Sequence, residues 1–312
     1  MLLNFIEFPY YINAPGGIVN LDKKIVIDNE YKSKGTLNMA YVTEYRANIF
    51  TLLYAYLNPN FDIYKAEDYL APSDTYETMS YRDSLELENA LDNAIILGYT
   101  KAGEKVDVKS NDMYVTYIYS EADTDIEIKD KIVKINEEDV YDLKSVKNII
   151  GKYDVGEKLD IEVTNDNKTY HRYAYIKEED GFKYVGIYIT QDKEYDVERN
   201  IKLKFKNNES GPSGGLMLTL EIYNELTSDD ITHGKKIVGT GTIDEDGNVG
   251  VIGGVKYKLK AAVKNKADIF LVPVDENYEE AMEEKDKNNY KIEIIPISTL
   301  DEALEYLNNL TY

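Results

Sequence analysis

Apolar and polar residues alternate with two different periods along this chain. Residues 35–42 and 201–206 alternate at every second position, which is typical of a strand with one buried face. Residues 85–98 repeat their apolar positions at helical spacing, and we expect Gly98 to end that helix in the C′ position. Residues 1–105 are therefore predicted to mix strands with at least one long helix.

The middle of the chain changes character. Short β-rich runs alternate with acidic turns, and one helical segment at residues 143–150 lies among them. The predicted strands are residues 113–119, 130–136, 158–164, 170–176 and 184–189. Five short strands with one or two helices in about 85 residues indicate a small β-barrel module over residues 106–190.

A serine candidate for catalysis lies in the last stretch, residues 191–312. The turn Gly-Pro-Ser-Gly-Gly at residues 211–215 leads into apolar positions at helical spacing, so Ser213 is predicted at a helix N-terminus. Free N–H groups and the helix dipole can stabilise an oxyanion there, and we expect the backbone of Gly214 to contribute. Taken alone, such a pentapeptide is more often a helix cap than a nucleophile.

The same pentapeptide fits the Gly-x-Ser-x-Gly elbow of an α/β-hydrolase esterase, which needs a later Asp and then a His. Only His233 follows Ser213, and it follows closely, while His171 lies upstream in the β-rich module. This supply of histidines weakens the esterase alternative. We expect His233 to be a turn or helix-end residue.

A lysine candidate follows the Gly-Gly pair at residues 253–254. The apolar positions of the predicted helix are Val255, Leu259, Ala262 and Val263. At about 100° per residue, Lys256 lies nearest this face, ahead of Lys258 and Lys260, and Lys264 points away. We therefore expect Lys256 to be desolvated, with its pKa lowered toward neutrality. A neutral lysine can activate a serine without histidine, metal or any other cofactor.

Composition limits the partners. The chain has 58 acidic and 36 basic residues, a net charge of −22, which argues against a nucleic-acid partner and permits attraction of cationic peptides. It has no cysteine, which excludes disulfides, thiol chemistry and Cys-based zinc sites. No stretch approaches the ~20 apolar residues that span a bilayer.

Residues 129–140 resemble the Gly-Asp-x-Ile-x-x-Ile-Asn-Gly signature of PDZ domains. Lys129 and Glu138 stand where the signature usually has glycine, and residues 111–114, where the carboxylate-binding loop should fall, lack the expected glycines. The resemblance implies a PDZ fold for residues 106–190. It leaves open whether this module binds a free peptide C-terminus.

Residues 211–217 and 239–263, which include Gly-Thr-Gly-Thr-Ile and Val-Ile-Gly-Gly-Val-Lys, resemble the proteolytic domain of Lon peptidases. Carried over position by position, the resemblance implies Ser213 as nucleophile and Lys256, the first lysine after Ile-Gly-Gly, as base. It also implies that Thr240 orients the lysine. Pro212 and Gly214 complete the serine loop, where the family has alanine in place of Gly214.

No Gly-x-x-x-x-Gly-Lys-[Ser/Thr] occurs, so the ATPase module of Lon is absent from this chain. The whole chain resembles PDZ-containing, secreted Lon-type peptidases. The implied fold is α+β, with a Lon-type proteolytic domain formed by residues 1–105 and 191–312 and an inserted PDZ-like β-barrel module, residues 106–190. Three consecutive domains are the rival arrangement.

The resemblance implies an ATP-independent serine endopeptidase for peptides and unfolded or exposed segments, with the PDZ module selecting or gating substrate. An extended substrate would pair with the strand that carries Leu203 and Phe205. In this family a single N-terminal membrane helix precedes a segment like residues 8–16, which implies an extracytoplasmic, membrane-anchored protein whose helix is absent from this chain. The alternative is a catalytically silent, PDZ-based peptide-binding scaffold with a Lon-like fold.

Overall fold

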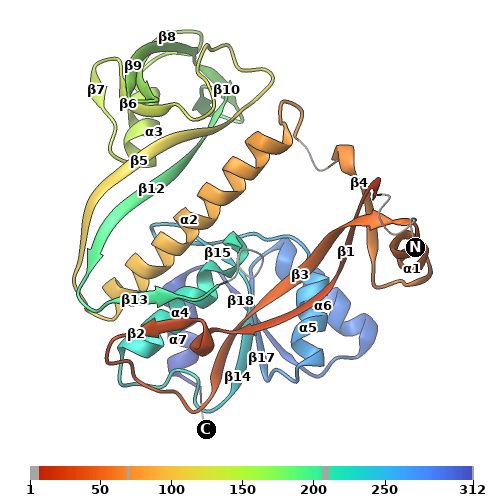
Figure 1. Ribbon diagram of the computed structural model, residues 1–312. Coiled ribbons are helices and arrows are strands. Elements are labelled where there is room, and N and C mark those ends of the chain that lie inside the picture. The colour runs from red at the N-terminus through yellow and green to blue at the C-terminus, as the bar shows by residue number, and fades with distance from the viewer. Residues whose placement is uncertain (1–6, 69–70, 206–210, 311–312) are drawn as a thin grey trace. The chain divides into compact units, whose positions relative to one another are not determined.

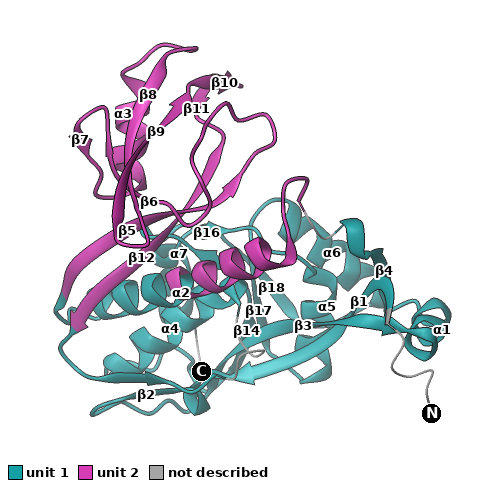
Figure 2. Ribbon diagram, turned by 45° about the horizontal axis from the view of Figure 1, so that its top comes forward, with its two compact units in different colours: residues 1–69, 90–106, 197–312 teal, residues 70–89, 107–196 magenta. Residues whose placement is uncertain are grey.

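The computed structural model describes residues 7–68, 71–205 and 211–310. Helices and strands both contribute, and the chain divides into two compact units (Figure 2). One unit comprises residues 1–69, 90–106 and 197–312, and the other comprises residues 70–89 and 107–196. The second unit is therefore larger than the predicted module at residues 106–190, because residues 70–89 and 191–196 also belong to it.

A six-stranded sheet forms the centre of the first unit, in the order β18-β17-β14-β3-β1-β4 (Figure 1). Its strands are β1 (Glu7–Asn20), β3 (Thr36–Asn48), β4 (Asp62–Lys65), β14 (Lys236–Gly239), β17 (Ile269–Pro273) and β18 (Glu293–Ile297). β14 runs parallel to β3 and β17, whereas β1 is antiparallel to β3 and β4. Strands from both ends of the sequence share this sheet, so residues 1–105 do not pack independently of residues 191–312.

Helices pack on both faces of this sheet. On one face, Val238, Phe270 and Val272 share a buried apolar cluster with α5 (Val255–Lys264) and α6 (Glu276–Asn288). On the other face, a Cβ at Gly239 would overlap with the Sδ of Met217 on α4 (Gly215–Leu226). The period-2 alternation of the strands thus supplies two separate contact surfaces. The last helix, α7 (Leu300–Asn308), contacts α4 and β18.

The long helix α2 (Tyr76–Lys101) contains Gly98 inside it. The prediction that Gly98 ends this helix is wrong, since three more helical residues follow it. A Cβ at Gly98 would lie only 2.6 Å from the Cγ2 of Ile222 on α4, so the glycine permits two helices to approach closely. The close approach explains why a glycine stands here, although it costs roughly 1 kcal/mol inside a helix.

The second unit is built around the sheet β12-β5-β6-β8-β9, with β7 paired to β6. Its elements are β5 (Val106–Ile118), β6 (Lys131–Ile135), β7 (Glu138–Asp139), α3 (Leu143–Gly151), β8 (Lys158–Asn165), β9 (Lys168–Tyr175), β10 (Lys177–Glu179), β11 (Phe182–Tyr184) and β12 (Ile187–Val197). An apolar core lies between α3 and this sheet. The pairings of the described residues do not close the sheet into the expected barrel.

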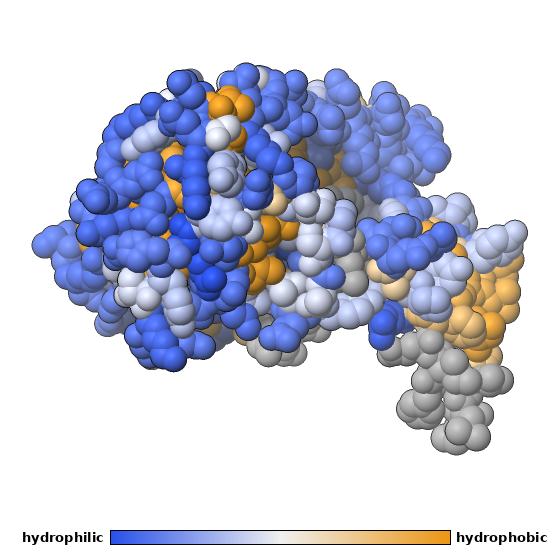
Figure 3. Space-filling model, turned by 90° about the horizontal axis from the view of Figure 1, so that it is seen from above, coloured by the Kyte–Doolittle hydropathy of each residue, from blue (hydrophilic) through white to orange (hydrophobic). Residues whose placement is uncertain are grey.

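An exposed apolar surface occurs on α1 (Ile49–Leu57), a helix without a charged residue. Figure 3 shows a hydrophobic area at the right of the view, the side on which Figure 1 shows α1. Its large exposed side chains are Ile49, Phe50, Leu53, Tyr54, Tyr56 and Leu57. Within the described ranges, no helix is both long and apolar enough to cross a membrane.

Candidate active site

Ser213 lies in the short 3-10 turn η4 (Pro212–Gly214), which leads directly into α4. Pro212 occupies the start of this turn, where its fixed φ suits helical geometry and its missing N–H is not needed. The Gly214 N–H donates to the carbonyl of Gly211 at 3.0 Å. In this conformation Gly214 therefore has no free N–H for an oxyanion, contrary to expectation.

The next two N–H groups after Gly214 are also used. Gly215 donates to the carbonyl of Pro212, and Leu216 donates to the carbonyl of Gly241 at 3.1 Å. The Ser213 N–H, by contrast, donates to no acceptor among the described residues. The donor at the start of α4 that remains for an oxyanion is thus the nucleophile candidate's own N–H.

The lysine that α5 buries is Lys258, so the expectation that Lys256 is the desolvated lysine is wrong. Lys258 is 3% exposed, and burial lowers its pKa to about 8. The helix also buries Tyr257 and Ala261, whereas Val263, which counted toward the predicted apolar face, is only half-buried. At about 100° per residue, the buried positions span an arc of about 200° centred on Lys258, and Lys256 lies outside it.

Lys256 is instead partly exposed and paired with Asp62 on β4, with 2.5 Å between its Nζ and the carboxylate. Partial burial alone would lower the pKa of Lys256, but the hydrogen bond and charge of Asp62 raise it above its usual value. A lysine held in its charged form cannot act as a base. Lys256 is also absent from the residues that line the pocket beside Ser213.

Thr240 links Lys258 to the serine loop. The Lys258 Nζ donates to the hydroxyl of Thr240 at 3.0 Å, and this hydroxyl donates to the carbonyl oxygen of Ser213, also at 3.0 Å. Thr240 is fully buried at the end of β14, and its N–H donates to the carbonyl of Leu271 on β17. The central sheet therefore fixes the position of the hydroxyl that holds both partners.

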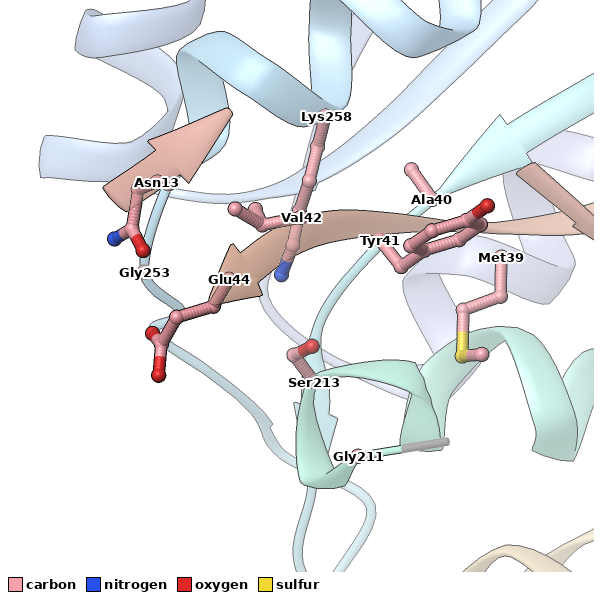
Figure 4. Close-up of a pocket in the computed structure, with 11 residues that line it drawn as sticks. Asn13, Met39, Ala40, Tyr41, Val42, Glu44, Gly211, Ser213, Gly253 and Lys258 are labelled. Carbon is pink, nitrogen blue, oxygen red and sulfur yellow. The ribbon is translucent and has the colours of Figure 1, made fainter. Parts of the chain in front are cut away.

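Ser213 and Lys258 line one pocket of about 360 Å³ (Figure 4). In the close-up the lysine amine and the serine hydroxyl point toward the same space. The remaining lining residues are Asn13, Met39, Ala40, Tyr41, Val42, Glu44, Gly211, Gly253 and Gly254. Gly254 is required by its backbone, because its φ is +70° and a Cβ there would lie 2.8 Å from the Cγ2 of Val42.

One wall of the pocket is a strand edge. β14 pairs with β3 only from Thr36 to Met39, so the following residues 40–44 are paired, within the described part of the chain, on the β1 side alone. These residues line the pocket, with the exception of Thr43. An extended peptide could add to such an edge by main-chain hydrogen bonds.

The predicted substrate strand lies elsewhere. Leu203 belongs to β13 (Ile201–Leu203) and pairs with Ile25 of β2 (Ile25–Ile27), while Phe205 follows this strand. Neither residue lines the pocket. The end of the predicted strand, residue 206, lies outside the described residues. No motif in the sequence distinguishes residues 40–44 as a pocket wall, because their role depends on where β14 stops pairing.

The part of the chain that contains Ser213 and Lys258 is similar to known proteins. Residues 203–309 match the family described as the Lon protease (S16) C-terminal proteolytic domain. The Lon protease of Azospirillum brasilense is 38% identical over 96 residues, which cover 31% of this chain and 12% of that protein. The Lon protease of Brucella suis biovar 1 is 35% identical over 96 residues, with the same coverage of 31% and 12%. The match thus covers a small part of each relative.

Among solved structures, the PDZ domain of the SdrC-like protein from Listeria monocytogenes is similar to part of this chain. The match covers 25% of this chain and 85% of that domain, with 17% sequence identity and a TM-score of 0.23. This score is too low to assign the fold of the second unit. The match to the family model, in contrast, spans Ser213, Thr240 and Lys258. Residues 203–309 are therefore similar to the Lon protease (S16) C-terminal proteolytic domain.

Proposed function

We propose that this protein is a serine endopeptidase in which Ser213 is the nucleophile and Lys258 is the general base. The observation that carries the proposal is a buried lysine, hydrogen-bonded to Thr240, that shares one pocket with Ser213. Burial without a charged partner favours the neutral amine, which is the form that can accept a proton.

The hydrogen bonds of Thr240 determine how the amine of Lys258 is oriented. Because the Thr240 hydroxyl donates its proton to the Ser213 carbonyl, it can only accept from Lys258. One N–H of the neutral amine is thereby used, and its lone pair stays available for the proton of the Ser213 hydroxyl. Thr240 is thus a positioning residue for the base.

The reaction would proceed in two halves. Lys258 takes the proton of the Ser213 hydroxyl as its oxygen attacks the scissile carbonyl, and the Ser213 N–H stabilises the oxyanion. Protonated Lys258 then gives this proton to the leaving amine, so the peptide bond breaks and an acyl-enzyme remains. Lys258 next activates a water that hydrolyses the ester, which restores both residues.

Substrates would be extended segments that lie along residues 40–44 of β3. In the absence of an ATPase module in this chain, short peptides, unfolded chains and exposed loops are the substrates that such an edge can take without ATP. The second unit, as a PDZ-like module, would select or gate them. Matched peptides that end in a free carboxylate or an amide test this role, because C-terminal recognition predicts faster cleavage of the free acid.

We also propose an extracytoplasmic location at a membrane. The uncharged, apolar surface of α1, on which Phe50 and Leu53 are 57% and 60% exposed, supports the membrane contact. The extracytoplasmic side rests on the resemblance to secreted Lon-type peptidases alone. Aromatic and aliphatic side chains of this kind insert at membrane interfaces. Flotation with phosphatidylcholine vesicles should recover the wild type and lose the Phe50→Ser/Leu53→Ser variant. A failure of the wild type to float, with self-association instead, would assign the surface to a second copy of the chain.

The direct test is cleavage of an unstructured protein, without ATP, by the wild type, Ser213→Ala and Lys258→Ala. We expect turnover only by the wild type, together with covalent labelling of Ser213 by a fluorophosphonate in the wild type alone. Equal turnover by all three proteins would refute the dyad. A wild type without turnover or labelling would support the alternative, a peptide-binding scaffold.

A further inference from the structure

Three carboxylates lie close together near the C-terminal end of α4, the end opposite Ser213. Glu221 and Glu225 lie one helical turn apart on α4, and Asp22 belongs to the short 3-10 helix η2 (Leu21–Lys23). One oxygen of each carboxylate lies within 4.8 Å of the other two. Glu221 is 1% and Glu225 is 2% exposed, so two of the three groups are withdrawn from water.

Three of the four oxygens of these two buried carboxylates lack a hydrogen-bond partner. The Oε2 of Glu221 and both carboxylate oxygens of Glu225 are buried without a donor in the structure. A buried polar atom is normally paired, and an unpaired buried carboxylate is among the most costly groups in a protein interior. Two carboxylates at i and i+4 on one helix also repel one another. Something must therefore neutralise this cluster, either protons or a cation.

The surrounding charges do not neutralise the cluster. Lys32 is the nearby cation, but it contacts Asp22 at 3.1 Å and Glu30 at 2.5 Å, not the two glutamates. Asp230 also faces Glu221 and adds negative charge.

We infer that Asp22, Glu221 and Glu225 form a binding site for a hard divalent cation, with Ca²⁺ the best match. Carboxylate oxygens are the ligands that Ca²⁺ and Mg²⁺ prefer. Ca²⁺ binds oxygens at about 2.3–2.6 Å, so its ligands can lie up to about 5 Å apart, whereas Mg²⁺ at about 2.0–2.1 Å needs a tighter cluster. The half-exposed Asp22 leaves one side open for water ligands.

Charge and helix geometry agree with this assignment. When ionised, the three carboxylates carry three negative charges, and Glu30 and Asp230 add to them, whereas Lys32 is the nearby cation, so the cluster attracts a divalent cation. The cluster lies in the last two turns of α4, where the partial negative charge of the helix C-terminus also favours a cation. A bound cation would tie α4, which begins directly after the Ser213 turn, to η2.

Thermal unfolding of chelator-treated protein tests the site. We expect Ca²⁺ at millimolar concentration to raise the Tm of the wild type by about 5 °C, and calorimetry to give one Ca²⁺ per chain. The Glu221→Gln/Glu225→Gln variant should lose this shift. The matched control is Glu279→Gln/Glu283→Gln, which removes an exposed i, i+4 pair from α6 and should keep it.

Two results of the unfolding experiments would overturn the assignment of a cation site. If Ca²⁺, Mg²⁺ and Mn²⁺ all leave the wild-type Tm unchanged, the two glutamates form a protonated pair and the assignment is overturned. A Ca²⁺ shift that survives in the double variant also overturns it. Should the double variant fail to fold, Asp22→Asn at the rim provides the second variant, with an expected loss of about tenfold in Ca²⁺ affinity. Both readouts are independent of proteolysis.

Discussion

The Nζ of Lys258 lies 3.0 Å from the hydroxyl oxygen of Thr240. This contact distinguishes Lys258 from Lys256, although the two lysines are similar candidates from the sequence. Lys258 projects into the core beside β14, whereas Lys256, two residues earlier, forms an ion pair with Asp62. The same helix therefore holds one lysine whose pKa burial lowers to about 8 and one whose pKa a neighbouring carboxylate raises.

The first prediction distinguishes these two lysines. Lys258→Met should lower kcat/KM on an unstructured protein by at least about 100-fold, because it removes the proposed general base and keeps the side-chain volume. Lys256→Met is the matched control and should stay within a few-fold of the wild type. The opposite ranking, with Lys256→Met inactive and Lys258→Met active, would return the role of base to Lys256.

The second prediction concerns pH. Since Lys258 must be neutral to accept a proton and burial lowers its pKa to about 8, kcat/KM should rise with pH, reach half its maximum near pH 8 and stay high in alkali. Thr240→Val should lower the maximum by roughly 10–100-fold and move this limb to lower pH, because the hydroxyl stabilises the ammonium more than the amine. Thr240→Ser should restore both. A profile that is flat from about pH 6 to about pH 10 contradicts a lysine base.

The third prediction is a gain in stability on loss of the base. The pKa of Lys258 falls from 10.5 to about 8 on folding, so the unfolded chain binds more protons between these values and stability rises with pH across that window. Below pH 8 the full cost of burying the cation applies, about 3 kcal/mol. Lys258→Met should therefore stabilise the protein at pH 7 by up to about 3 kcal/mol, and this gain should vanish near pH 10.5.

Urea unfolding at several pH values measures this difference. The control, Lys256→Met, breaks a partly exposed ion pair and should instead destabilise the protein by less than about 1 kcal/mol at pH 7. If Lys258→Met is less stable than the wild type at pH 7, burial of the Lys258 ammonium does not lower the free energy of unfolding, which contradicts the prediction.

Local patterns in the sequence were sufficient to place the serine turn before a helix, and they located α3 and the longer strands of the second unit to within a few residues. The choice between Lys256 and Lys258 failed for a definable reason. The prediction assigned Val263 to the core because it is apolar and did not count Tyr257. In the structure, Val263 is only half-buried, whereas Tyr257 is buried. Amphipathic side chains such as Tyr and Lys can lie on a buried face, so apolar residues alone misplace its centre.

Tertiary contacts account for the other failures. Gly98 looks like a helix end from its neighbours, but its role depends on Ile222, far along the chain. The substrate edge was expected at Leu203, yet the edge beside Ser213 is residues 40–44, which become an edge only because β14 stops pairing at Gly239. Such features arise from pairing between distant segments, and no local period encodes them.

The fourth prediction couples Gly214 to Met39. Gly214 has φ −96°, which any residue can adopt, so the backbone does not require glycine. A Cβ there would instead overlap with the Sδ of Met39, a buried residue that lines the pocket. Gly214→Ala should destabilise the wild type but cost less in a Met39→Ala background. Urea unfolding of the four proteins should give a coupling free energy of about 1 kcal/mol or more, and strict additivity would contradict this contact.

The fifth prediction concerns the charge of the substrate. Glu44 lines the pocket on the same side as Asn13 (Figure 4), at the end of the strand edge that an extended peptide would follow. Its carboxylate should favour peptides with Lys or Arg near the scissile bond. Glu44→Lys should lower kcat/KM for such peptides about fivefold relative to Asp- or Glu-containing ones, because an exposed charge pair contributes up to about 1 kcal/mol.

Two controls separate this local effect from the net charge of −22. Glu283→Lys makes the same change of charge on the exposed side of α6 and should leave the ratio between the two peptides unaltered. Salt at about 1 M shortens the screening length to about 3 Å and should abolish the effect of Glu44→Lys. If both variants shift the ratio equally, the whole negative surface attracts the peptide and Glu44 has no separate role in specificity.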